Sequence, residues 1–284
     1  MDHSNGTVLV TGPTSGIGRE IARQLNAGGF DLVLACRDQE AGERVAAELR
    51  QDRPGAAIRV MRVDVSSADG IRQLGSALRR EAIPLDALVN NAGMHAAQRR
   101  CTPTGVELTF ATNVLGYFLL SLELRDRLET AVAIRGQARI VNVASTFATT
   151  PDLEDLQFES RPFVGKEAYS QSKACNRMLT RALARRLEGS GVTVNSMAPG
   201  LIQTALFRET KPFTRLMVRM AGFFFGRTVE EGADTAVWLT TSGDVKGRSG
   251  GFYSKRQEVV CAFAHEPREE RLWTLCESLA SREP

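Results

Sequence analysis

Short apolar runs alternate with amphipathic stretches along the first two-thirds of the chain. The apolar runs are TVLVT (7–11), DLVLAC (31–36), AIRVMRVDV (57–65), LDALVN (85–90), ARIVNVAS (138–145) and VTVNSMAP (192–199). The stretches between them place apolar residues at helical spacing. Strands that are apolar on both faces are typical of a parallel sheet covered by helices on both sides. The pattern therefore predicts an α/β fold with a doubly wound parallel sheet of about seven strands.

Two stretches interrupt this alternation, but no linker, repeat or low-complexity segment divides the chain. We therefore expect a single domain over residues 1–284. Residues 150–165 form a long polar loop, and residues 211–227 form an amphipathic helical stretch. The segment 266–281 predicts a C-terminal helix that serves packing or oligomer contact.

The composition is that of an ordinary soluble globular protein, with 43% hydrophobic residues, 24% charged residues and a net charge of +3. No run of Lys and Arg is long enough for a nucleic-acid-binding surface. The five cysteines are widely spaced and the histidines number three, which predicts free thiols and no metal site. Because the sequence shows neither a signal-peptide pattern nor an apolar run of about 20 residues, we expect a cytoplasmic protein without an integral membrane anchor.

A glycine-rich turn follows the first apolar run and precedes a helical stretch. Glycines tolerate positive φ angles and let backbone N–H groups approach a diphosphate, while the start of the helix adds partial positive charge. The alternative is a glycine-rich turn that binds nothing. We favour dinucleotide binding in a Rossmann fold. The expected contacts from this turn are Gly12, Thr14, Ser15, Gly16, Ile17 and Gly18.

Several motifs, taken in order, carry a resemblance to a known family. They are Thr11-Gly12-x-x-x-Gly16-Ile17-Gly18, Asn90-Asn91-Ala92-Gly93, Ser145, Tyr169-x-x-x-Lys173 and Pro199-Gly200. Over nearly its whole length the chain resembles the short-chain dehydrogenase/reductase family. The segments LACRD, YSQSKACNRMLTRALARRLEGSGVTVN and RLWTLCESL are most similar to its retinol-dehydrogenase-like branch. The resemblance implies an oxidoreductase that exchanges hydride between a nicotinamide cofactor and a carbonyl or alcohol.

The resemblance places the reacting centre at Asn113, Ser145, Tyr169 and Lys173. It implies that Tyr169 gives a proton to the substrate's carbonyl oxygen and that Ser145 holds this oxygen. Because Tyr169 and Lys173 are four residues apart in a helix, we expect the ammonium, together with the positive nicotinamide ring of the oxidised cofactor, to lower the pKa of the phenol toward neutrality. Lys173 would also contact the nicotinamide ribose, and Asn113, at a helix irregularity, would complete a proton relay through a water. Taken singly, these residues have structural alternatives: an exposed helix pair, a strand-end hydroxyl and a buried amide.

The end of the second apolar run favours NADP(H) over NAD(H). An acidic residue at this place accepts hydrogen bonds from the free 2′-hydroxyl of the adenosine ribose. The chain has Arg37 instead, and a guanidinium pairs with a 2′-phosphate. The alternative is a solvated arginine that begins a helix, since Ser15 replaces the second basic residue that the family carries in its glycine turn.

Further cofactor contacts are implied by the resemblance alone. They are Asp64, Val65, Asn91, Ala92, Gly93, Pro199, Gly200, Ile202 and Thr204. Asp64 and Val65 would border the adenine, and Asn91 and Gly93 the ribose. Pro199 and Gly200 would redirect the chain, so that backbone groups near Ile202 and the Thr204 hydroxyl meet the nicotinamide carboxamide and the diphosphate. As alternatives, Asp64 could cap a helix and Asn91 could simply turn the chain.

Two segments bear on the substrate. The loop 150–165 forms either a wall of the substrate pocket or a solvated surface loop. In the segment 201–227, a substrate lid by resemblance, an apolar helix face predicts a bulky lipophilic substrate, with a membrane-surface helix and core packing as alternatives. The apolar face consists of Phe213, Leu216, Met217, Met220 and Phe224, with Arg215 and Arg219 opposite.

These observations together predict an NADPH-dependent reductase of a ketone or aldehyde on a lipophilic small molecule, reversibly an alcohol dehydrogenase, as in a bacterial biosynthetic ketoreductase. A retinol/retinal-type dehydrogenase and a non-catalytic NADP(H)-binding sensor are the alternatives. Many relatives pair subunits through the helices around Asn113 and Tyr169, so a homo-oligomer is a further expectation. No nucleic-acid partner is expected.

Overall fold

The structure, a computed structural model, describes residues 5–200 and 228–282. The expected lid 201–227, with Ile202 and Thr204, lies outside the described residues. Within the described ranges, no helix combines the length and the apolar character that crossing a bilayer requires.

One sheet of eight strands runs through the described residues, in the order β3-β2-β1-β4-β5-β6-β7-β8. Its strands are β1 (Thr7–Thr11), β2 (Asp31–Cys36), β3 (Ile58–Arg62), β4 (Ala87–Asn90), β5 (Ala138–Val143), β6 (Val192–Met197), β7 (Phe252–Ser254) and β8 (Gln257–Glu258). All neighbours pair in parallel except β7 and β8, which are antiparallel. The doubly wound parallel sheet is therefore confirmed.

The eight strands agree with the prediction of about seven, with one short strand beyond that number. The extra strand, β8, is a two-residue partner of β7 across a tight turn formed by Lys255 and Arg256. Both turn residues have positive φ angles, as a two-residue hairpin requires. Because both residues of β8 are exposed, this strand leaves no apolar run in the sequence.

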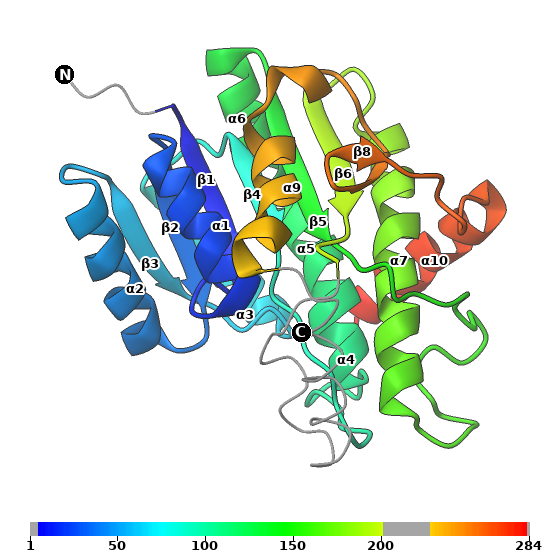
Figure 1. Cartoon of the computed structure of the whole chain (residues 1–284). Helices are drawn as coiled ribbons and strands as arrows, with labels where there is room; N and C mark the ends of the chain where they lie inside the picture. The colour runs from blue at the N-terminus through cyan, green and yellow to red at the C-terminus, as the bar shows by residue number, and fades with distance from the viewer. Residues whose placement is uncertain (1–4, 201–227, 283–284) are drawn as a thin grey trace.

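Helices cover both faces of the sheet (Figure 1). One face carries α1 (Gly16–Ala27), α2 (Gln39–Asp52) and α9 (Val229–Thr241). The other face carries α3 (Ala68–Arg80), α4 (Leu108–Phe110), the π-helical segment η1 (Ala111–Leu115), α5 (Gly116–Glu123), α6 (Arg125–Arg135), α7 (Gly165–Arg186) and α10 (Glu266–Ala280). A short 3₁₀ turn, η3 (Gly243–Val245), follows α9. The predicted C-terminal helix is thus confirmed as α10.

Each side of the sheet has its own hydrophobic core, which explains the unbroken apolar runs. In β1, Leu9 packs into the cluster under α3, α5 and α7, whereas Val8 and Val10 pack into the cluster under α1, α2 and α9. All three side chains are fully buried. A strand buried on both faces needs an apolar residue at every position, so it loses the alternating pattern of a half-exposed strand.

The strand order reverses at β1, which pairs with β2 on one side and β4 on the other. At such a point, the connections leaving the carboxyl ends of the two strands run to opposite sides and open a crevice. The turn after β1 and the segment after β4 both begin at this edge. The fold therefore places the predicted glycine turn and the Asn90–Gly93 motif side by side.

Candidate active site

A cavity of about 400 Å³ opens at the carboxyl edge of the sheet, across the point where the strand order reverses. The predicted cofactor residues that line it are Gly12, Thr14, Ser15, Gly16, Ile17, Gly18, Arg37, Asp64, Val65, Asn91, Ala92, Gly93, Tyr169, Lys173 and Pro199. Gly200, with a φ of +87°, turns the chain just after Pro199 without lining the cavity. Residues that the sequence did not single out complete the wall: Ala35, Cys36, Asp38, Val63, Met94, Thr112, Val143 and Ala144.

The turn between β1 and α1 has the shape of a phosphate cradle. Gly12 and Gly16 have φ angles of +65° and +55°, where side chains are disfavoured. A β-carbon at Gly18 would lie 2.2 Å from the carbonyl oxygen of Gly12. Ser15, the N-cap of α1, makes no side-chain hydrogen bond to the first turn of the helix. The turn therefore fits a diphosphate, because backbone N–H groups at the helix start stay available and no side chain fills the approach.

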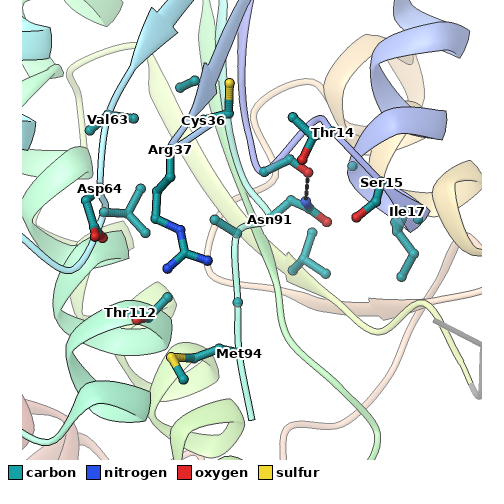
Figure 2. A pocket seen from close by; sticks show the side chains of 18 of the residues that line it. Thr14, Ser15, Ile17, Cys36, Arg37, Val63, Asp64, Asn91, Met94 and Thr112 are labelled. Carbon is teal, nitrogen blue, oxygen red and sulfur yellow. Dashed lines mark hydrogen bonds between the residues drawn. The ribbon is translucent and has the colours of Figure 1, made fainter. Parts of the chain in front are cut away.

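Asn91 holds this turn against the end of β4. Its Nδ2 donates to the carbonyl oxygens of Thr11 (2.9 Å) and Gly12 (3.2 Å), the latter contact drawn as the dashed line in Figure 2. In return, the Thr11 hydroxyl accepts hydrogen bonds from the backbone N–H groups of Asn91 and Ala92, at 2.9 and 3.0 Å. Asn91 thus lines the cavity and also has the structural role that the sequence left open. Thr11, a residue outside the predicted set, shares this role.

The chain after β3 forms the wall where the adenine is expected. The predicted strand 57–65 ends at Arg62, so that Val63, Asp64 and Val65 leave the sheet and line the cavity. The Asp64 carboxylate accepts hydrogen bonds from the backbone N–H and the hydroxyl of Ser66, at 2.9 and 2.7 Å. The N-cap of α3 is Ser67, so Asp64 turns the chain before the helix and does not cap it.

Arg37 follows β2 and reaches into the cavity between Asp64 and Asn91 (Figure 2). Two further arginines, Arg44 of α2 and Arg62 at the end of β3, line the adjoining groove together with Arg37. Arg62 is in register with Cys36, the residue before Arg37. No carboxylate of the described residues forms an ion pair with any of these three arginines.

The same groove also contains acidic residues, but two of them are already engaged. The Asp38 carboxylate accepts a hydrogen bond from the backbone N–H of Ala41 and caps α2. Glu43 lies 3.8 Å from Arg50, whereas Glu40 is exposed in the first turn of α2. The arginines are therefore the groups in this groove that can take a new anionic partner.

Tyr169 and Lys173 lie on one face of α7 and are both buried, with exposed fractions of 8% and 4%. The Lys173 Nζ donates to the carbonyl oxygen of Val143 at 2.9 Å and lies 5.7 Å from the centre of the Tyr169 ring. Ser145 follows β5 and forms a side-chain hydrogen bond with Tyr169. The structure thus brings together three of the four predicted catalytic residues.

Burial governs the ionisation of both helix residues. It raises the pKa of Tyr169 to about 12, although the hydrogen bond with Ser145 acts in the opposite direction. It lowers the pKa of Lys173 to about 7. For the protein groups by themselves, burial thus outweighs the hydrogen bond, because removing water disfavours the charged phenolate. The expectation that Lys173 and the oxidised nicotinamide ring together lower the pKa of Tyr169 stays a prediction for the complex with the cofactor.

Asn113, the fourth predicted residue, lies in the π-helical segment η1, which confirms the expected helix irregularity. Its amide exchanges two hydrogen bonds with the backbone of Met94, at 2.8 and 2.9 Å, and donates to the Ser172 hydroxyl at 3.0 Å. A β-carbon at Gly93 would lie 3.3 Å from the Asn113 Oδ1 and 3.7 Å from the Lys173 Nζ. The amide satisfies backbone groups, and it also borders the small space beside the lysine.

The loop 150–165 packs against helices. Leu153, Leu156 and Phe158 are buried, and the first two belong to the core under α7. The backbone N–H of Asp152 donates to Gln171 of α7 at 2.6 Å, and Arg268 of α10 donates to the carbonyl oxygen of Pro151 at 2.7 Å. The loop is thus held against the helices from its inner side, while Asp152, Glu154 and Glu159 are exposed. None of the residues lining the described cavity belongs to it, so its role as a wall of the substrate pocket stays a prediction.

Comparisons with known proteins agree with this geometry. Residues 6–214 match the family described as short chain dehydrogenase. Retinol dehydrogenase 13 of Mus musculus is 33% identical over 276 residues, which cover 94% of this chain and 81% of that protein. An uncharacterised protein of Mycobacterium paratuberculosis has a similar crystal structure, with a TM-score of 0.76, 27% identity and coverage of 98% of this chain and 94% of that chain. The NADP complex of Pseudomonas aeruginosa RhlG gives a TM-score of 0.69 and 29% identity, over 88% of this chain and 94% of that chain. The chain therefore belongs to the short chain dehydrogenase family.

Proposed function

We propose that this protein is an NADP(H)-dependent oxidoreductase that reduces a ketone or aldehyde on a lipophilic small molecule and also runs in reverse as an alcohol dehydrogenase. Membership of the short chain dehydrogenase family makes it an oxidoreductase acting on CH–OH groups. The observation that carries the proposal is the hydrogen bond between Ser145 and the buried Tyr169, which lines the cavity together with Lys173 of the same helix.

Carbonyl reduction needs a group that donates a proton to the developing alkoxide. A Tyr169 phenol with its pKa at about 12 is protonated at neutral pH and is ready to donate from its hydroxyl. The Ser145 hydroxyl, hydrogen-bonded to the same phenol, holds the carbonyl oxygen beside it. With NADPH bound in the cavity, the carbonyl carbon would receive its hydride from the cofactor, and the proton from Tyr169 would complete the alcohol.

After donation, Tyr169 carries a negative charge and must recover its proton. Lys173 is the nearby group with a pKa at about 7, so its Nζ gains and loses a proton readily at neutral pH. The Asn113 amide borders the space beside this nitrogen, as a relay to bulk water requires. In the direction of alcohol oxidation, Tyr169 must begin as a phenolate, which a pKa of about 12 disfavours at neutral pH.

The groove lined by Arg37, Arg44 and Arg62, called the arginine groove below, supports NADP(H) as the cofactor. At the end of β2, where NAD(H)-binding chains of this fold carry an acid for the 2′-hydroxyl, this chain has Arg37, and the first carboxylate after it is Asp38. Asp38 caps α2, and Arg37, Arg44 and Arg62 lie without ion pairs among the described residues. A 2′-phosphate would give these guanidinium groups a doubly hydrogen-bonding partner.

Two observations support a lipophilic substrate. The relative named retinol dehydrogenase 13 takes its name from an apolar alcohol. In this chain, Phe147 lies two residues after Ser145, with its backbone N–H bonded to the Ser145 hydroxyl at 3.0 Å and its side chain 43% exposed. An exposed aromatic residue this close in the sequence to the reacting hydroxyl favours an apolar substrate.

The test is NADPH oxidation with a panel of lipophilic carbonyl compounds that includes all-trans-retinal, decanal and 2-decanone. We expect turnover by the wild-type protein, and a kcat lower by roughly 10²- to 10⁴-fold in Tyr169→Phe, because general acid catalysis is lost. The NADPH Kd, measured by nucleotide fluorescence, should stay within about twofold, since the ring is retained. Tight NADPH binding without turnover of any compound would instead support a non-catalytic sensor.

A further inference from the structure

Arg177 is a buried cation for which the proposed reaction has no use. It lies one helical turn beyond Lys173, so that Tyr169, Lys173 and Arg177 follow each other at intervals of four on α7. Only 6% of Arg177 is exposed, and no carboxylate among the described residues forms an ion pair with it. Burying a charge without a counter-ion is costly, so the surroundings of this side chain must compensate in another way.

The compensation comes from one carbonyl group and two aromatic rings. The Arg177 Nη2 donates a hydrogen bond to the main-chain oxygen of Ser145. The guanidinium carbon lies 3.7 Å from the centre of the Phe252 ring and 5.3 Å from that of Phe263. The rings keep the planar group in one orientation and attract its charge. Burial lowers the pKa of Arg177, but an arginine stays protonated at any physiological pH.

Ser145 lies just beyond the end of strand β5, where the backbone no longer pairs with the neighbouring strand. The strand β5 ends at Val143, and the last backbone bond to β6 in this region runs from the Ala144 N–H to the Met197 oxygen at 2.7 Å. Ser145 then begins the long connection to α7. The hydrogen bond from Arg177 therefore fixes the main chain one residue beyond the sheet, directly at the residue whose hydroxyl meets Tyr169.

We propose that Arg177 is a positioning residue, which anchors the Ser145 carbonyl and thereby holds the Ser145 hydroxyl in line with Tyr169 and the substrate oxygen. The inference rests on the proposed function in so far as Ser145 binds that oxygen. If Arg177 only filled space, a methionine should replace it without loss, because a methionine packs between two phenylalanines at least as well as a buried charge does. Packing alone would therefore leave catalysis intact in Arg177→Met.

The experiment compares Arg177→Met and Arg177→Lys with the wild-type protein, using NADPH and decanal as probes. We expect kcat to fall roughly 10- to 100-fold in Arg177→Met, as small misplacements of a catalytic group do. The NADPH Kd and the melting temperature should stay near their wild-type values. Arg177→Lys should recover part of the loss, because an ammonium donates to the same carbonyl but does not stack as a planar group.

Arg181→Met is the matched control, since Arg181 lies one turn further along α7 and pairs with Glu269, away from Ser145. It should lower the melting temperature and keep the wild-type kcat per folded molecule. A wild-type kcat in Arg177→Met would overturn the proposal, as would a loss that only follows the folded fraction.

Crystal structures of the wild type and Arg177→Met decide the question even if decanal is not turned over. A broken Ser145–Tyr169 hydrogen bond in the variant supports the positioning role, and an unmoved Ser145 rejects it. Failure of the proposed function would look different, because the wild-type protein itself would then bind NADPH without oxidising it.

Discussion

Lys173 keeps a hydrogen bond to the Val143 carbonyl oxygen in a setting that has removed nearly all of its water. Its pKa falls from an ordinary value of 10.5 to about 7. Between these two values, the unfolded chain holds the proton and the folded protein has released it, so raising the pH stabilises the folded state. We predict that, from pH 7 to 9, the free energy of unfolding of the nucleotide-free protein rises by about 1 kcal/mol per pH unit relative to Lys173→Met.

Urea unfolding of both proteins at pH 7, 8 and 9 measures this difference, and Lys173→Met serves as the control because it shares every other titrating group. Parallel curves would mean that Lys173 stays protonated through this range. The window ends near pH 10 because the unfolded chain itself loses the Lys173 proton around 10.5, where the difference in slope disappears. Tyr169, whose pKa is raised to about 12, contributes an opposite slope above pH 10 in both proteins.

Arg37 and Arg62 approach one groove from neighbouring strands. We predict that Arg37→Ala weakens NADPH binding about tenfold and Arg62→Ala about fivefold, since each exposed guanidinium loses a charge-assisted hydrogen bond to the 2′-phosphate. The NADH Kd should change by less than about twofold, because NADH lacks that phosphate. Fluorescence titration of both nucleotides measures the two constants.

Arg59→Ala is the control for these substitutions. Arg59 belongs to the same strand as Arg62 but pairs with Glu81, outside the arginine groove. It should leave both dissociation constants unchanged. Equal losses for NADPH and NADH in Arg62→Ala would contradict a role for this residue in recognising the phosphate.

At the scale of elements, the turn between β1 and α1 depends on the absence of side chains. A β-carbon at Gly18 would meet the Gly12 oxygen at 2.2 Å and the Asn91 Nδ2 at 2.3 Å. We predict that Gly18→Ala lowers the free energy of unfolding by about 1–3 kcal/mol through overpacking and abolishes measurable NADPH binding. Urea unfolding and fluorescence titration test the two effects.

Gly243→Ala is the matched control, because a β-carbon there has no neighbour within 4 Å and its backbone has no positive φ. This variant should retain wild-type stability to within about 0.5 kcal/mol. Gly18→Ala behaving like Gly243→Ala would show that the turn adapts, and that the close contact is not what excludes other residues.

Elements buried on both faces could be predicted from the sequence, and exposed or irregular ones could not. The runs that became β1 and β2 are almost entirely apolar because a hydrophobic core packs against each face of these strands. The two-residue strand β8 is exposed and carries no such pattern. The π-helical segment around Asn113 left no pattern of its own and was expected only by resemblance.

The candidate site shows the same division. Motif residues such as Tyr169 and Lys173 could be paired because both lie on one helix at a known spacing. Arg62 could not be placed beside Arg37 without knowing that β3 lies next to β2. The Arg177 guanidinium packs against Phe252 and Phe263, which are distant from it in the sequence, so its surroundings could not be predicted from the sequence.

At the scale of the whole molecule, α10 covers the face through which a homo-oligomer was expected to pair. Nearly every residue of α7 from Ala168 to Leu183 is buried, and Trp273 of α10 packs edge-on against Phe118 of α5, with ring centres 4.8 Å apart. We predict that Leu122→Glu, at an exposed apolar position of α5, leaves the molar mass measured by light scattering unchanged. A lower mass in this variant would show that subunits do pair here.

The attachment of α10 to α7 depends on a carboxylate that is completely buried. Glu269 receives Arg181 at 2.7 Å and Arg185 at 2.5 Å, while both arginines keep about a third of their side chains exposed. In Glu269→Gln, an amide N–H₂ faces a guanidinium, and the buried negative charge that forms ion pairs with Arg181 and Arg185 is lost. We predict a loss of about 2–3 kcal/mol in the free energy of unfolding, somewhat less than for a fully buried pair because water still reaches the arginines.

Glu266→Gln provides the comparison on the same helix. Glu266 is 4.0 Å from Arg185 and 68% exposed, so its loss should cost less than about 0.5 kcal/mol. Urea unfolding gives both values, and kcat per folded molecule should match the wild type in both variants. Equal costs would mean that the buried carboxylate contributes no more than a surface ion pair. In that case the apolar contacts of Leu272, Trp273 and Cys276 with the core would by themselves hold α10 in place.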